Sequence, residues 1–132
     1  MRNGNISNKH GELLMVDFDS ILLSRKPSFL GKLLGERIEL KFEGIGLLRR
    51  IFKKTDFRIY IVSTVCKDAD ELKKELNRHS VPYQDVYCSD VDTFRRLYTF
   101  SEYDMLLTNN AVFKGEMNVS RAFSSSELLA FL

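Results

Sequence analysis

The stretch ELLMVDFDS, residues 12–20, decides the fold of this chain. Its apolar residues, Leu13 to Val16, run without a break into two acids, Asp17 and Asp19. An unbroken apolar run of this length is typical of a strand that is buried on both faces, as strands of a parallel sheet are. The pattern therefore predicts a buried strand with carboxyl groups at its carboxyl end.

A second buried strand is predicted over residues 57–62, which are rich in Ile, Tyr and Val and end at Ser63 and Thr64. Between the two strands, residues 43–54 place apolar side chains at helical spacing and basic side chains on the opposite face. The chain thus begins with the order strand, helix, strand.

The same alternation continues to the end of the sequence. We expect helices at 67–79 and 91–100, strands at 84–88, 103–107 and 118–123, and a last helix from Ser124, whose spacing to Glu127 is that of a capping box. Repeated alternation of this kind favours an α/β fold, a three-layer α/β/α sandwich around a mostly parallel, Rossmann-like sheet.

The length of 132 residues, 44% of them hydrophobic, suits one domain with one core. We expect this domain over residues 12–132, a flexible polar leader over 1–11, and a flap-like insertion over 20–42, which is longer than a strand-to-helix turn needs. No apolar stretch resembles a signal peptide or a membrane span, and the two cysteines fit neither a disulfide framework nor a zinc site. The sequence predicts a cytoplasmic protein without a membrane partner.

The net charge of +2 is unevenly distributed along the chain. Residues 20–58 contain ten Lys or Arg against four Asp or Glu, a local charge of +6. Such a segment can face an anion, so the charge favours a phosphorylated small molecule, a nucleotide or a nucleic acid as partner. A solvated basic helix would have the same composition.

Ligands of open parallel sheets bind outside the carboxyl ends of the strands, so the residues that follow each strand are the candidates for a site. These residues are polar throughout: Asp17 to Ser20, Ser63 and Thr64, Ser89 and Asp90, and Thr108 to Asn110. A carboxylate at the end of a buried strand needs a cation, a basic partner or a raised pKa. The alternative interpretation is structural, with one acid capping the following turn and the other solvated.

Two of these strand ends together resemble motifs of the haloacid dehalogenase (HAD) superfamily. An apolar strand followed by Asp-x-Asp is the first motif of that family, matched by Leu13 to Asp19, and an apolar strand ending in Ser or Thr is its second, matched by Ile59 to Ser63. The resemblance extends to the order of elements over residues 12–132. It implies a HAD-like phosphohydrolase without a large cap domain, with Mg²⁺ as cofactor and a phosphorylated small molecule, nucleotide or nucleic-acid end as substrate.

The resemblance also implies a role for each matched residue. Asp17 would be the nucleophile that accepts the phosphoryl group, and Asp19 the general acid and base for the leaving group and the attacking water. Both carboxylates would bind Mg²⁺. Ser63, and with less support Thr64, would hydrogen-bond a phosphoryl oxygen, although a hydroxyl here could instead cap the helix expected at 67–79.

The chain departs from the family in its third and fourth motifs. For the Lys or Arg of the third motif, which would bind the phosphate, the nearest candidates are Arg95 and Arg96. In place of the metal-binding acids of the fourth motif it has Asn109 and Asn110, while Asp104 opens its strand and would lie at the wrong end. Asparagine offers a neutral oxygen that can bind Mg²⁺ without attracting it, so we expect weak metal binding.

Two other functions stay open. The asparagines favour a pseudoenzyme that keeps the fold and binds a phosphorylated ligand or a protein partner without turnover. The other alternative is a ribonuclease resembling the PIN and NYN type, because residues 89–94, SDVDTF, resemble a later motif of such enzymes. Asp17, Asp90 and Asp92 would then gather Mg²⁺ for phosphodiester hydrolysis, unless Asp90 and Asp92 merely begin a helix.

Overall fold

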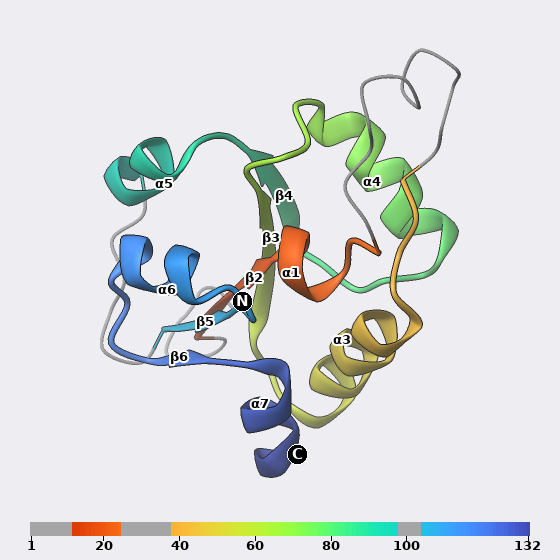
Figure 1. The fold of residues 1–132 in the computed structure, drawn as a ribbon. Coiled ribbons are helices and arrows are strands. Elements are labelled where there is room, and N and C mark those ends of the chain that lie inside the picture. Colours follow the sequence, from red (N-terminus) through yellow and green to blue (C-terminus); the bar gives the residue numbers. More distant parts are fainter. Residues whose placement is uncertain (1–11, 25–37, 98–103) are drawn as a thin grey trace, which may run out of the picture.

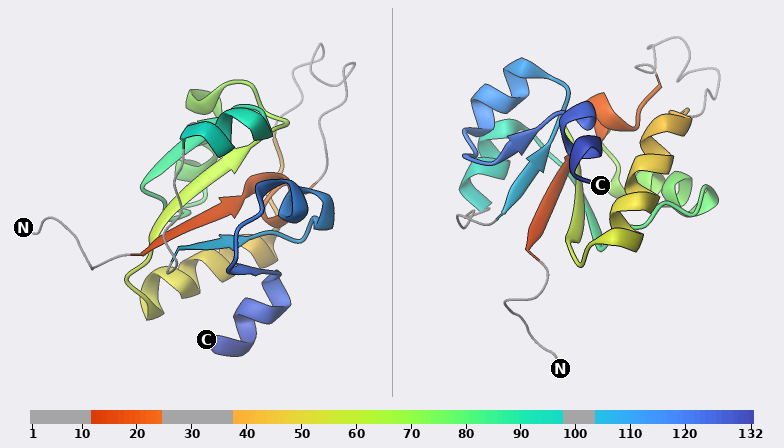
Figure 2. Two further views of the ribbon diagram at one scale, coloured as in Figure 1. Left: turned by 90° about the vertical axis from the view of Figure 1, so that its left-hand side faces the viewer. Right: turned by 90° about the horizontal axis from the view of Figure 1, so that it is seen from below.

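The structure is a computed structural model, and it describes residues 12–24, 38–97 and 104–132. The described strands form one sheet and are β2 (Leu13–Asp17), β3 (Arg58–Ser63), β4 (Asp85–Cys88), β5 (Met105–Leu107) and β6 (Ala122–Phe123). All paired strands are parallel, and their order is β4-β3-β2-β5-β6 (Figure 2). The predicted α/β class with a Rossmann-like sheet is confirmed, and β2 lies at its centre.

Helices connect the strands and cover both faces of the sheet (Figure 1). They are α1 (Phe18–Ile21), α3 (Phe42–Lys54), α4 (Ala69–Arg78), α5 (Val91–Leu97), α6 (Ala111–Met117) and α7 (Ser125–Phe131). The capping box predicted for the last helix is present, with Ser124 and Glu127 each accepting from the other's backbone. Across the described ranges, no helix combines the length and the apolar character needed to span a membrane.

Strand β2 is buried on both faces, as its unbroken apolar run predicts. Leu14, Met15 and Val16 are fully buried. Leu14 and Val16 share an apolar core with α1, α3, α4 and α7, whereas Met15 belongs to a second core with α5 and α6. Burial of each such side chain contributes about 1.5–3 kcal/mol to folding. The three residues thus join the two outer layers of the sandwich.

Helix α3 matches the helix expected at 43–54 because its apolar residues recur at helical spacing. Ile45, Leu48 and Ile51 are buried in the core. Near its start, Gly44 approaches α1 so closely that a Cβ there would lie 2.2 Å from the carbonyl oxygen of Ile21. A glycine is needed at this position because only a residue without a side chain permits that approach.

The described ends of the segment expected as a flap, residues 20–24 and 38–42, take part in regular hydrogen-bonded structure. Its first residues belong to α1, and Leu23 forms an antiparallel bridge with Leu40. The amide of Lys41 donates to the carbonyl of Leu22 over 2.7 Å, so the two ends of the segment lie side by side. Residues 25–37 of the expected flap, and the leader at 1–11, lie outside the described residues.

Two expectations about the last third of the chain need correction. Helix α6 was not expected, because seven residues with Gly115 among them make too short an apolar pattern. The strand expected at 118–123 is limited to Ala122 and Phe123, since Asn118 takes a left-handed conformation with φ 54° and ends α6. The final part of the helix expected at 91–100 lies outside the described residues.

Candidate functional site

The carboxyl ends of three neighbouring strands meet at one edge of the sheet. Val16 of β2 pairs with Leu107 of β5, so the residues that follow them, Asp17 and Thr108, are neighbours. On the other side of β2, strand β3 ends at Ser63. The predicted gathering of strand-end side chains is therefore observed for β2, β3 and β5.

Asp17 is buried at this edge, with 3% of its surface exposed. Its Oδ2 accepts two hydrogen bonds of 2.7 Å, from the hydroxyls of Ser20 and Thr108. Its Oδ1 accepts the backbone amide of Asp19 at 3.2 Å. The carboxyl group is thus held by neutral donors, and Oδ1 has the weaker contact of its two oxygens.

Burial raises the pKa of Asp17 above its ordinary value. The hydrogen bonds from Thr108 and Ser20 oppose this rise, while the negative charge of Asp19 adds to it. A carboxyl group removed from water without a cationic partner favours its neutral form, which is the physical cause of the shift. A raised pKa is one of the three conditions that the sequence predicts for a carboxylate in this place.

Asp19 is half-buried and is held by residues that follow β3. Its Oδ1 accepts from the Ser63 hydroxyl at 2.6 Å. Its Oδ2 accepts from both the amide and the hydroxyl of Thr64, each at 2.9 Å. Asp17 and Asp19 are therefore fixed by donors from opposite sides of β2, and Ser63 and Thr64 contact Asp19 directly.

Ser63 also organises the turn after β3. Its hydroxyl oxygen accepts the amides of Val65 at 3.2 Å and Cys66 at 3.0 Å while its proton is donated to Asp19. The helix that follows begins at Ala69 and is capped by Asp68, so the alternative that a hydroxyl at 63 or 64 caps it is wrong. The serine positions Asp19 and the turn together.

Two residues of the site, Ser20 and Thr108, are among the strand-end candidates of the sequence but were given no role there. The Thr108 hydroxyl contacts Asp17, as described, and accepts the amide of Asn110 at 3.0 Å. The Ser20 hydroxyl contacts both Asp17 and Thr108, and it accepts the amide of Asn109 at 2.9 Å. Their position after a strand or beside an acid was the available signal, but the strand order was needed to interpret it.

Asn109 and Asn110 have structural partners of their own. The side-chain oxygen of Asn109 accepts from the amide of Ser125 at 2.8 Å, which ties the end of β5 to the start of α7. Asn110 is the N-cap of α6, where its side-chain oxygen accepts the amides of Val112 and Phe113. Both asparagines are exposed, and their oxygens face the protein's own amides.

Asp17 and Asp19 are the two carboxylates of this site that could hold Mg²⁺. No group of three or more His, Cys, Asp or Glu side chains converges anywhere in the part of the chain that the structure describes. Magnesium in proteins commonly keeps several waters and binds one or two carboxylates together with substrate phosphate. The two aspartates fit that minimal arrangement because they are carboxylates that attract a cation. Their oxygens and the asparagine oxygens all accept hydrogen bonds from the protein, so charge is the difference between the two pairs.

The basic residues predicted for phosphate binding lie apart from the aspartates. Arg95 and Arg96 are exposed on α5, where Arg96 contacts the hydroxyl of Thr93, and no contact of either arginine with the two aspartates is found among the described residues. The ammonium group of Lys41 is nearer to the site. It donates to the carbonyl oxygen of Ser20 at 3.0 Å, because the ends of the 20–42 segment lie side by side.

Three other acids that the sequence analysis considered, Asp90, Asp92 and Asp104, lie apart from Asp17 and Asp19. Asp90 follows β4, two strands from β2, and its carboxylate accepts the amide of Thr93, which holds the pKa of Asp90 below its ordinary value. Asp92 is exposed in the first turn of α5. Asp104 accepts the amide of Leu13 at the opposite end of β2, where the sequence places it.

Comparison of the chain with protein-family models, with curated proteins and with solved structures found no match. The candidate function rests on the geometry of the site and on the resemblance of its motifs.

Proposed function

We propose that this domain is a HAD-like phosphohydrolase that acts on a phosphorylated small molecule, nucleotide or nucleic-acid end through an aspartyl-phosphate intermediate. In this proposal Asp17 is the nucleophile and Asp19 the general acid and base. The phosphoryl group would enter from the carboxyl edge of the sheet, beside the strand ends of β2, β3 and β5.

One observation carries the proposal. Asp17 and Asp19 leave the same central strand, and each is held by hydroxyl donors from a different neighbouring strand, Thr108 on one side and Ser63 with Thr64 on the other. A carboxylate whose position is already fixed loses little entropy when it attacks a bound substrate. Two carboxyl groups in different environments, one buried and one half-buried, also suit different chemical roles.

The proposed chemistry has two displacements at phosphorus. In the first, an oxygen of Asp17 forms a bond to phosphorus, the ester P–O bond breaks, and Asp19 gives a proton to the leaving oxygen. In the second, Asp19 takes a proton from water, the water oxygen bonds to phosphorus, and the bond to Asp17 breaks to release phosphate. Oδ1 of Asp17 is the candidate nucleophilic atom because its single contact is the long one, 3.2 Å.

The chain's own residues would support these steps. Ser63 and Thr64 hold Asp19, and Thr108 and Ser20 hold Asp17. Lys41 would bring a positive charge towards an incoming phosphate. Mg²⁺ bound by Asp17 and Asp19 would offset the repulsion between the anionic substrate and the carboxylates.

A second candidate function is a phosphate-binding pseudoenzyme. The observation that favours it is the engagement of Asn109 with Ser125 and of Asn110 with the start of α6. Because both asparagines are neutral and no group of three or more acids converges among the described residues, metal-dependent turnover would be weak or absent.

The test is release of phosphate from 4-nitrophenyl phosphate with and without Mg²⁺. We expect Mg²⁺-dependent turnover by the natural protein, a loss of at least about 100-fold in Asp17→Asn and in Asp19→Asn, and no loss in Asp56→Asn, which changes an exposed acid elsewhere. Circular dichroism checks that each variant is folded. Equal activity in the natural protein and Asp17→Asn contradicts the proposal.

Absence of turnover in every folded protein would favour the pseudoenzyme, and calorimetric titration with inorganic phosphate then tests that function. The pseudoenzyme predicts binding that weakens in Lys41→Gln. Cleavage of single-stranded RNA that Asp90→Asn abolishes and Ser63→Ala leaves intact would favour the ribonuclease instead.

A further inference from the structure

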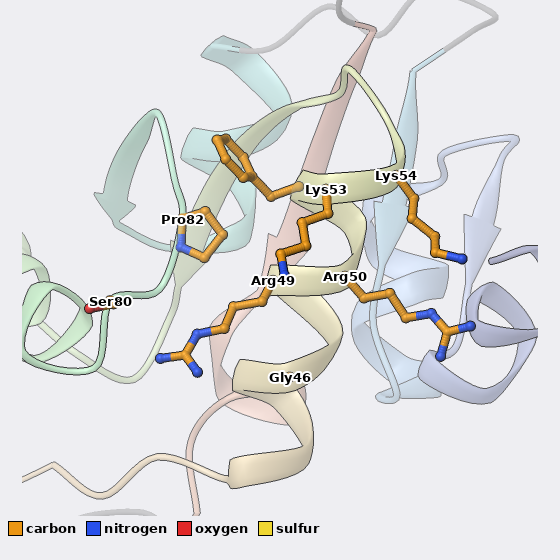
Figure 3. Close-up of a pocket in the computed structure, with 8 residues that line it drawn as sticks. Gly46, Arg49, Arg50, Lys53, Lys54, Ser80 and Pro82 are labelled. Atoms are coloured by element: carbon orange, nitrogen blue, oxygen red, sulfur yellow. The ribbon is translucent and has the colours of Figure 1, made fainter.

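A groove lined with cations lies along the second half of α3 (Figure 3). The groove has a volume of about 600 Å³, within the usual range of ligand clefts. Its lining includes four basic residues, one aromatic residue and one proline: Arg49, Arg50, Lys53, Lys54, Phe52 and Pro82. Figure 3 shows Arg49 extending towards the turn after α4, while Arg50 and Lys54 extend towards the C-terminal elements. Among the described residues, no acid lines the groove.

The groove is separate from the carboxylate site. Helix α3 begins next to Lys41, which contacts Ser20 at the carboxyl edge, and it ends just before β3 begins, at the amino edge. Lys41 and Lys53 are twelve residues apart, which corresponds to about 18 Å along a helix. A ligand in the groove therefore does not need Asp17 or Asp19.

The four cations repel one another. Arg49 and Lys53, and likewise Arg50 and Lys54, are four residues apart on one helix, and like charges at that spacing destabilise it. The helix dipole stabilises Lys53 and Lys54 in the last turn, but it does not remove their repulsion from Arg49 and Arg50 in the preceding turn. An anion between these side chains would relieve that repulsion.

No Asp or Glu side chain is found to pair with these four cations in the described residues. Arg49 donates to the backbone oxygen of His79, and Lys54 donates to a main-chain oxygen of Leu132, the last residue of the sequence, at 3.3 Å. For Arg50 and Lys53, no hydrogen bond or ion pair is found within the described ranges. A guanidinium with five N–H donors keeps most of them available after one such contact.

The exposed ring of Phe52 favours an anion that also carries a planar aromatic group. Phe52 is 63% exposed although it lies among the cations. Single-stranded nucleic acids are bound by positive grooves that follow the backbone and by aromatic rings on which bases stack. An inorganic phosphate ion has no base to stack on the Phe52 ring, so the ring would add nothing to its affinity. An anionic bilayer fits less well, because the groove is hollow and the apolar face of α3 is buried against the sheet.

We propose that the groove formed by Arg49, Arg50, Lys53, Lys54 and Phe52 is a binding site for single-stranded nucleic acid. The cations contact the phosphates of the strand, and Phe52 stacks on a base. This site does not rest on the proposed phosphohydrolase function, because it lies at the opposite edge of the sheet.

The test is fluorescence anisotropy of a labelled 12-nucleotide oligothymidine titrated with the full chain at 50 to 200 mM salt. We expect binding whose logarithm falls with the logarithm of salt concentration with a slope of about −2 to −3, as three or four phosphate contacts to a single strand require. The double variant R50E/K53E should weaken binding at least tenfold. The matched control K74E/K114E changes two exposed lysines outside the groove by the same charge and should weaken it less than threefold.

Phe52 provides a second, charge-neutral test. F52A should weaken binding about tenfold, as loss of one stacked base predicts. The control F42A removes an even more exposed phenylalanine, 83% exposed, from the other end of the same helix and should have no effect. Asp17→Asn should bind as the natural protein does, so failure of the phosphohydrolase proposal would not affect this one.

Several results would overturn the proposal. They are no binding at 50 mM salt, equal weakening in R50E/K53E and K74E/K114E, and full binding by F52A. Binding to vesicles containing phosphatidylserine, lost in R50E/K53E, together with no binding of the oligonucleotide, would identify a membrane surface as the partner instead. Circular dichroism of each variant excludes unfolding as the cause of lost binding.

Discussion

The hydroxyl of Thr108, the residue that follows β5, donates a 2.7 Å hydrogen bond to the carboxyl group of Asp17 on the central strand β2. The two residues are 91 positions apart in sequence, and both are 3% exposed. A buried carboxyl group without a cationic partner depends on such neutral donors. Thr108 therefore connects the stability of the sheet edge to the ionisation of Asp17.

Thr108→Val, which keeps the shape and removes the hydroxyl, should raise the pKa of Asp17 further because one opposing hydrogen bond is lost. We expect the free energy of unfolding at pH 7 to fall by about 1–3 kcal/mol, measured by urea denaturation. Thr108→Ser keeps the hydroxyl, so its free energy of unfolding should fall much less than that of Thr108→Val. Unchanged stability in Thr108→Val would show that the bond contributes nothing.

The raised pKa of Asp17 makes stability depend on pH. The folded protein binds the proton more tightly than the unfolded chain, so ionising Asp17 costs stability as pH rises from about 3.8 through the raised value. Asp17→Asn removes that dependence. The difference in unfolding free energy, variant minus natural protein, should increase from pH 4 upwards and then level off, measured by urea denaturation in buffer containing EDTA. A difference that decreases with pH would contradict a raised pKa.

Replacing Asn110 by Asp should strengthen metal binding without loss of stability, because Asp caps helices as well as Asn does. If the proposed function is correct, calorimetry should show tighter Mg²⁺ binding and the assay with 4-nitrophenyl phosphate a higher turnover. Asn109→Asp is the companion variant. It loses the amide that donates to the Ser125 hydroxyl at 3.1 Å, so it should lose about 0.5–1.5 kcal/mol of unfolding free energy. If neither variant binds Mg²⁺ more tightly or turns over faster, the missing metal ligand is not at position 109 or 110.

Two glycines of α3 should respond in opposite directions to substitution by alanine. A Cβ on Gly44 would lie 2.2 Å from the backbone oxygen of Ile21, so Gly44→Ala should destabilise by about 1–3 kcal/mol or more. A Cβ on Gly46 meets nothing within 4 Å, so Gly46→Ala should stabilise by about 0.5–1 kcal/mol through helix propensity. Thermal denaturation of both variants measures the difference. Equal effects would mean that α3 does not pack on α1 as described.

Burial raises the pKa of the Cys88 thiol to about 11. Because the thiolate is the reactive form, Cys88 should react slowly with iodoacetamide at pH 8 in the native protein and much faster after unfolding. Mass spectrometry after timed alkylation measures the rate for each cysteine. Rapid labelling of Cys88 at pH 8 would contradict the raised pKa.

The sequence alone determined the elements whose signal is local. The unbroken apolar run of residues 13–16 predicts a strand buried on both faces, and the apolar spacing within 43–54 predicts α3, because periodicity is read over a few consecutive residues. The capping box from Ser124 to Glu127 is local for the same reason. The two aspartates that follow the apolar run are likewise part of the local sequence, with Asp17 at the end of β2 and Asp19 in the first turn of α1.

The tertiary structure decided which strand ends meet. Thr108 contacts Asp17 and Thr64 contacts Asp19 because β5 and β3 flank β2, and no local pattern encodes that order. The tertiary structure also showed that the Asn110 side-chain oxygen caps α6, a helix whose seven residues are too few to predict from periodicity. Among the described cations of 20–58, it placed Lys41 near the carboxylates and Arg49, Arg50, Lys53 and Lys54 in a groove at the other edge, because α3 runs from one end of the sheet to the other.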